Sequence, residues 1–84
     1  MMGLEYLIFL RGMSRQDFSK KLGITRQQLN SWLNKGKAAR PIPYKHIKSC
    51  SEFFNVPGVF ISKLLTNEDK VKILNLEIQR LEAI

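Results

Sequence analysis

One stretch, residues 13–36, constrains the fold of this chain most strongly, because it contains two helix-start signatures in succession. The first is Ser14 followed by Asp17, the spacing of a capping box, in which two side chains satisfy free backbone N–H groups at the start of a helix. The second is Thr25 followed by Gln28, which repeats the same device. Two helices are therefore expected to begin within this short stretch.

A single glycine lies between the two signatures. Gly23 occupies the place where the first helix has to end, and helix ends commonly take a left-handed conformation that glycine adopts without a steric penalty. The spacing predicts a short helix over 15–22, a tight turn, and a second short helix over 26–34. This arrangement is a helix-turn-helix.

The second helix has one apolar side and one unusual polar side. Leu29, Trp32 and Leu33 share a face at helical spacing, which predicts that this face is buried. The rest of the helix presents Arg26, Gln27, Gln28, Ser31 and Asn34. Solvated helix faces favour Lys and Glu, whereas Arg and Gln can pair bidentately with guanine and adenine edges in the major groove of DNA. This set of side chains favours a helix face that binds nucleic acid over an ordinary solvated face.

The run FSKKLGITRQQLNSWLNKGK resembles the helix-turn-helix of the Cro/phage-repressor superfamily, also called the XRE family. The apolar and glycine positions of that motif are occupied by Phe18, Leu22, Gly23, Ile24, Leu29 and Trp32. The later segment NVPGVFISKLLTNED resembles the one that closes the family's domain, so the resemblance covers most of residues 3–67. It implies an all-α, compact domain of five to six helices of the lambda-repressor-like type, here with a C-terminal helix extension.

The resemblance also implies roles for individual side chains. Members of the family insert the second helix of the motif into the major groove of double-stranded DNA. The implied base contacts are Arg26, Gln27, Gln28, Asn30 and Ser31. The implied phosphate contacts at the helix N-termini are Arg15 and Thr25.

Positive charge is concentrated in the half of the chain that holds the helix-turn-helix. The net charge is +7 overall, with +8 on the residues through Lys48 and −1 on the remainder. The linker after the second helix carries three cations, Lys35, Lys37 and Arg40. Cations at this place would bind the phosphates that flank an inserted helix. The alternative for these three residues is a solvated basic turn.

Three further helices are expected to complete the core of this small domain. Their ranges and inward side chains are 3–11 with Leu4, Leu7 and Ile8; 44–54 with Ile47, Phe54 and either Cys50 or Ser51; and 59–65 with Phe60, Ile61 and Leu64. Gly12 is expected to end the first of them.

The last segment predicts one more helix, capped by Thr66 or Asn67 and running to about Ala83. The spacing of Val71, Leu74, Ile78 and Leu81 is that of a two-heptad seam, and Ile73 and Leu76 add apolar surface beside it. We therefore expect a helix-turn-helix domain over 1–65 and a dimerisation helix over 66–84. The alternative is that this helix folds back onto the domain.

Catalysis and metal binding have little support. The chain has one His and one Cys, and although His46 and Cys50 share a helix face, a zinc site needs three or four ligands. A core thiol and a surface imidazole are expected instead, with no cofactor. No nucleophile with a base and an orienting group is evident, nor a glycine-rich phosphate loop, so an enzyme is not expected.

These observations together predict a sequence-specific, double-stranded DNA-binding transcriptional regulator. The expected form is a cytoplasmic repressor that binds an inverted-repeat operator as a homodimer, with half-sites about one helical turn apart. No membrane association is expected, and no small-molecule ligand is evident. The alternative is an antitoxin-like or adaptor module whose C-terminal helix engages a different protein.

Overall fold

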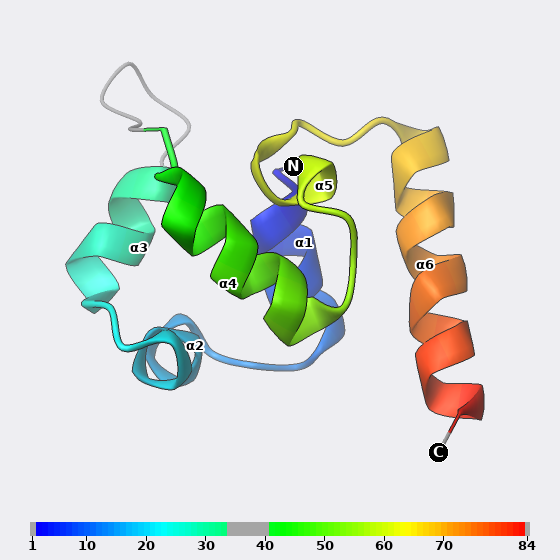
Figure 1. The fold of residues 1–84 in the computed structure, drawn as a ribbon, viewed down its shortest axis with the longest axis horizontal. Helices are drawn as coiled ribbons and strands as arrows, with labels where there is room; N and C mark the ends of the chain where they lie inside the picture. Colours follow the sequence, from blue (N-terminus) through cyan, green and yellow to red (C-terminus); the bar gives the residue numbers. More distant parts are fainter. Residues whose placement is uncertain (1, 34–40, 84) are drawn as a thin grey trace.

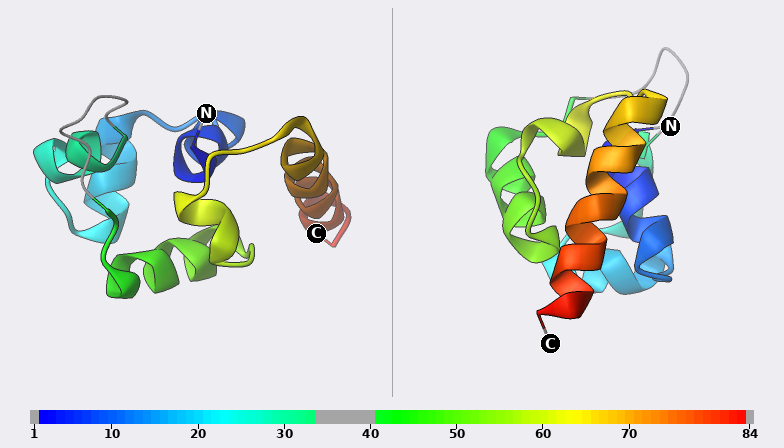
Figure 2. Two further views of the ribbon diagram at one scale, coloured as in Figure 1. Left: turned by 90° about the horizontal axis from the view of Figure 1, so that it is seen from above. Right: turned by 90° about the vertical axis from the view of Figure 1, so that its right-hand side faces the viewer.

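The computed structural model describes residues 2–33 and 41–83, and within these ranges the chain forms six α-helices and no β-strand (Figure 1). The helices are α1 (Gly3–Leu10), α2 (Arg15–Leu22), α3 (Arg26–Leu33), α4 (Tyr44–Phe54), α5 (Val59–Ser62) and α6 (Asn67–Glu82). Helices α1 to α5 surround the core, and α6 lies along one side of them (Figure 2). The predicted all-α fold is confirmed.

The helix-turn-helix forms through the local signals that predicted it. Ser14 Oγ accepts a hydrogen bond from the Asp17 N–H at 3.0 Å, and Thr25 Oγ1 accepts one from the Gln28 N–H at 3.0 Å. Gly23 ends α2 with φ = 70°, in the left-handed region where a Cβ is disfavoured. The two caps and the glycine therefore fix the angle at which α3 leaves α2.

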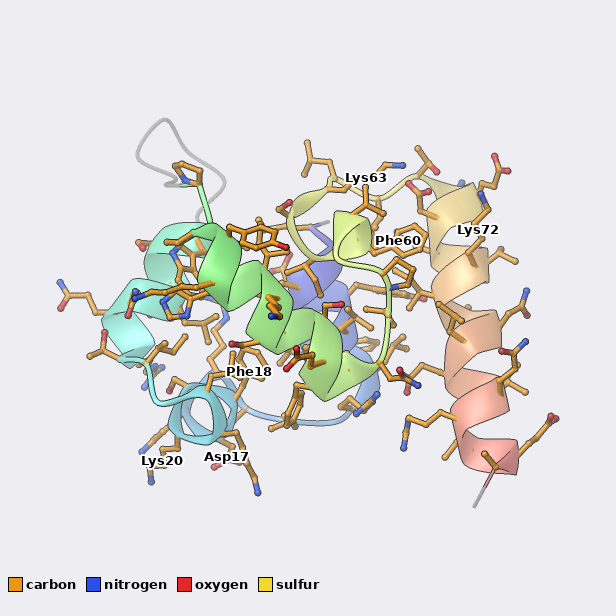
Figure 3. The ribbon with its side chains drawn as sticks, viewed as in Figure 1. Asp17, Phe18, Lys20, Phe60, Lys63 and Lys72 are labelled. Carbon is orange, nitrogen blue, oxygen red and sulfur yellow. The ribbon has the colours of Figure 1, made fainter. Side chains whose placement is uncertain are left out.

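The core is built from one to three buried apolar side chains of each surrounding helix. Phe18 points inward from α2, whereas Asp17 and Lys20 point away (Figure 3), and the Phe18 ring stacks on the Phe54 ring at 5.5 Å between centroids. Cys50 is fully buried in this core, as expected, and its burial raises the pKa of the thiol to about 11. The fully buried side chains are Leu4, Leu7, Phe18, Leu29, Cys50, Phe54, Ile61 and Ile73.

Two expectations about the core are wrong. The predicted helix 59–65 ends at Ser62, because Lys63 becomes extended and its carbonyl accepts the Gly3 N–H at 2.9 Å. Leu64 then forms an isolated bridge with Met2, and its side chain is 76% exposed rather than buried. His46, expected as a surface imidazole, is half-buried because its ring packs against Trp32 with the centroids 5.0 Å apart.

Helix α6 is attached to the rest of the chain by ion pairs as well as by apolar packing. Ile73 is buried in the core and Leu76 packs against it. The Arg11 guanidinium donates to both carboxylate oxygens of Glu77, at 2.9 to 3.2 Å, and also to the Phe54 carbonyl at 3.0 Å. Burial alone would raise the pKa of Glu77, but the hydrogen bonds from Arg11 and Arg80 outweigh it, so the pKa is lowered.

Helix α6 begins after Thr66, one of the two caps predicted from the sequence, and Thr66 and Asp69 form a full capping box that was not predicted. Thr66 Oγ1 accepts from the Asp69 N–H at 3.1 Å, and the Asp69 carboxylate accepts from the Thr66 N–H at 3.0 Å. Lys63 also donates to Asp69 at 3.1 Å. The Thr66 backbone bond and then the Lys63 side chain lower the pKa of Asp69 to about 2. This carboxylate therefore stays ionised and holds the connection between α5 and α6 well into acid.

Candidate nucleic-acid interface

The side of α3 that faces away from the core is left uncovered. Leu29, Trp32 and Leu33 are buried, as predicted. Among the residues expected to contact bases, Arg26, Gln27 and Asn30 are exposed and Gln28 and Ser31 are half-buried. Thr25, Gln27, Gln28 and Ser31 line one hollow on this surface. The structure thus places Gln27, Gln28 and Ser31 around one hollow, and it leaves Arg26 and Asn30 exposed on the same helix.

Two hydroxyl groups at this face are set up for opposite hydrogen-bonding roles. Thr25 Oγ1 accepts from the Gln28 N–H, which leaves its own hydrogen free to donate to an acceptor such as a phosphate oxygen. Ser31 Oγ donates to the Gln28 carbonyl at 2.7 Å, which leaves its lone pairs free to accept. Such an oxygen can accept a hydrogen bond from an amino group on the edge of a base.

Arg15, the other predicted phosphate contact, lies at the junction of three helices. Its guanidinium donates to Asn30 Oδ1 on α3 at 2.9 Å and lies 3.4 Å from Glu5 Oε2 on α1. No sequence motif signalled this link, because its members are separated by ten and fifteen residues and no periodicity relates them. The phosphate contact of Arg15 stays a prediction.

The predicted phosphate contacts of the linker, Lys35, Lys37 and Arg40, lie outside the described residues. Further cations, for which the sequence predicted no role, are exposed on helices next to α3. They are Lys20 and Lys21 in the last turn of α2 and Lys45 and Lys48 on α4. The excess of positive charge in this half of the sequence was the only signal that pointed to them.

The seam predicted for dimerisation lies far from α3. Helices α3 and α6 occupy opposite ends of the longest dimension of the molecule (Figure 1), which extends 37 Å. Helix α6 turns Ile73 and Leu76 toward the core, so it does fold back onto the domain. The four side chains of the seam remain 40% to 59% exposed; they are Val71, Leu74, Ile78 and Leu81. One helix therefore carries a docked apolar stripe and a second, accessible one.

The part of the chain that the structure describes contains no group of three or more potential metal-ligating side chains. Within the same ranges, every helix is too short or too polar to cross a bilayer.

The sequence matches the family described as Helix-turn-helix over residues 5–61. That range runs from α1 into α5 and includes the whole of the exposed α3 face. No curated protein and no solved structure gave a significant match to the chain.

Proposed function

The chain belongs to the Cro/phage-repressor (XRE-type) helix-turn-helix family of DNA-binding transcriptional regulators, and on this basis we propose that it is a sequence-specific repressor acting as a homodimer. The single observation that supports base reading best is the uncovered face of α3, where Arg26, Gln27 and Asn30 are exposed beside a hollow. In this proposal residues 1–65 bind DNA and residues 66–84 hold the dimer together.

Gln27 and Lys37 provide a matched test of this assignment. We expect Gln27→Ala to weaken binding to the selected operator by about 1–3 kcal/mol and to relax the preference at one base pair, because a base contact is removed. Lys37→Ala should weaken binding to all DNA sequences alike, because a phosphate contact is removed. It should also reduce the slope of log affinity against log salt by about one. Fluorescence anisotropy on operator and scrambled duplexes measures both. Equal losses on the two duplexes for Gln27→Ala would contradict the base contact.

The exposed seam of α6 supports a two-fold dimer. Val71, Leu74, Ile78 and Leu81 form a second apolar stripe beyond the one that packs on the core, which is more than a solvated helix requires. Because α6 and α3 lie at opposite ends of the molecule, pairing through α6 places the two α3 helices on the outside of the dimer. Inverted half-sites, predicted from the sequence to lie about one helical turn apart, present both major grooves on one side of the DNA when their spacing is a whole number of turns.

Ile78→Glu is the sharpest test of this dimer, because it places a charge in the middle of the seam on a side chain that is 51% exposed and does not belong to the core. We expect the variant to be a folded monomer by light scattering and to lose affinity for a two-half-site operator while keeping its affinity for one half-site. Gln79→Glu adds the same charge to the next, exposed position and should leave the dimer intact. A wild-type chain that is monomeric at micromolar concentration would contradict the dimer.

The second candidate function uses the same seam in a different way. An antitoxin-like or adaptor module would place another protein on Val71, Leu74, Ile78 and Leu81. A monomeric wild-type chain that binds DNA only through single half-sites is the result that favours this alternative.

A further inference from the structure

Arg15, the first residue of α2, contacts a polar side chain on each of two other helices. Its Nη1 donates to Asn30 Oδ1 on α3 at 2.9 Å, and its Nη2 lies 3.4 Å from Glu5 Oε2 on α1. We infer that Arg15 is a positioning residue that determines which end of the Asn30 amide faces DNA, and thereby which base Asn30 recognises. The inference rests on the proposed function, because Asn30 belongs to the face proposed to read bases.

The chemistry of arginine fixes the orientation of the Asn30 amide. The guanidinium has five N–H donors and no acceptor, so the Asn30 atom that faces it must be the carbonyl oxygen. The contact with Glu5 holds the planar guanidinium from its other side. The NH₂ group of Asn30 is consequently directed away from Arg15. Asn30 is exposed and lies one turn along α3 from Arg26 and Gln27, at the edge of the same face.

This orientation changes the base that the amide matches. A free asparagine recognises adenine by accepting from N6 with its oxygen and donating to N7 with its nitrogen. In this chain the oxygen is turned toward Arg15, so the NH₂ group, with its two N–H donors, is the end of the amide that is turned away from Arg15. Guanine offers two acceptors, N7 and O6, on the same edge. The arrangement therefore selects guanine over adenine at the base pair that Asn30 faces.

The test compares base preferences rather than overall affinity. The full-length wild-type chain first selects its half-site from random duplex DNA, and affinities are then measured for every single-base variant of that half-site. At one position of the half-site, the affinity of the wild type for guanine should be at least about fivefold higher than its affinity for adenine. Arg15→Met keeps a long side chain but removes the donors, which frees Asn30 Oδ1, so this ratio should shift toward adenine by about fivefold.

Asn30→Asp tests the same orientation from the other side. The carboxylate still accepts from Arg15 but has no N–H to offer, so the preference for guanine should disappear and cytosine, whose N4 amino group is a donor, should be favoured. Lys48→Met is the matched control, because it removes one exposed cation from α4. Its base preferences should equal those of the wild type.

A readout without DNA accompanies these measurements. The side-chain amide signals of Asn30 in a ¹⁵N–¹H spectrum should move in Arg15→Met and stay in place in Lys48→Met. If Arg15→Met lowers affinity equally at all base pairs, or leaves the Asn30 signals unchanged, the inference is wrong while the proposed function stands. A wild-type chain that selects no sequence would overturn the proposed function itself, and this inference with it.

Discussion

Gly3→Ala is expected to lower the free energy of unfolding by about 3 kcal/mol or more, at the upper end of what single substitutions cause. Gly3 is buried in the first turn of α1, where a Cβ would overlap the backbone carbonyl oxygen of Phe60 in α5. Backbone atoms cannot rotate away as a side chain can, so α1 and α5 would have to separate. Urea denaturation followed by circular dichroism measures the loss.

Gly23→Ala provides the control for this prediction. A Cβ on Gly23 meets no atom within 4 Å, so only the left-handed backbone opposes it, at a cost of about 1 kcal/mol. The two glycines thus separate the effect of close packing from the effect of backbone conformation. A Gly3→Ala chain as stable as Gly23→Ala would show that α1 and α5 do not approach each other as described.

Glu77→Ala should cost about 2 kcal/mol of unfolding free energy, the largest loss we expect from any charged residue of α6. Its carboxylate takes three donated hydrogen bonds from Arg11, and the two side chains are only 11% and 15% exposed. Removing one member of a buried pair leaves the other without compensation, and the small remaining exposure reduces the effect from that of a fully buried pair. Chemical denaturation gives the size of the loss, and amide hydrogen exchange locates it in α6.

Glu68→Ala removes a carboxylate of the same helix from an exposed pair. Glu68 lies 3.9 Å from Lys72, and both side chains are more than half exposed, so the expected change is below about 0.5 kcal/mol. Equal, small losses for Glu77→Ala and Glu68→Ala would contradict the attachment of α6 through Arg11.

Local signals in the sequence were sufficient to predict the helix-turn-helix. The caps at Ser14 and Thr25 and the turn at Gly23 act through neighbours within a few residues, so their spacing specifies them. The buried face of α3 follows from helical periodicity in the same way. The exposed face, and with it the candidate base contacts, is what remains once the buried face is assigned.

Contacts between distant parts of the chain could not be predicted. The early end of α5 depends on Gly3, some sixty residues away in sequence, and the anchor of α6 joins Arg11 to a residue 66 positions later. Helix α6 also carries two apolar stripes, and the sequence did not distinguish the one that docks from the one that stays exposed. Periodicity reports that a face is apolar, whereas only the assembled core determines what covers it.

Selection from random duplex DNA at physiological ionic strength tests most directly whether the face of α3 opposite Trp32 reads bases. We predict that the wild-type chain enriches one inverted-repeat sequence, and that Gln27→Ala loses the preference at one symmetric pair of positions within it. A chain that binds every duplex equally well under these conditions, or a Gln27→Ala variant that enriches the unchanged sequence, would contradict base reading by this face.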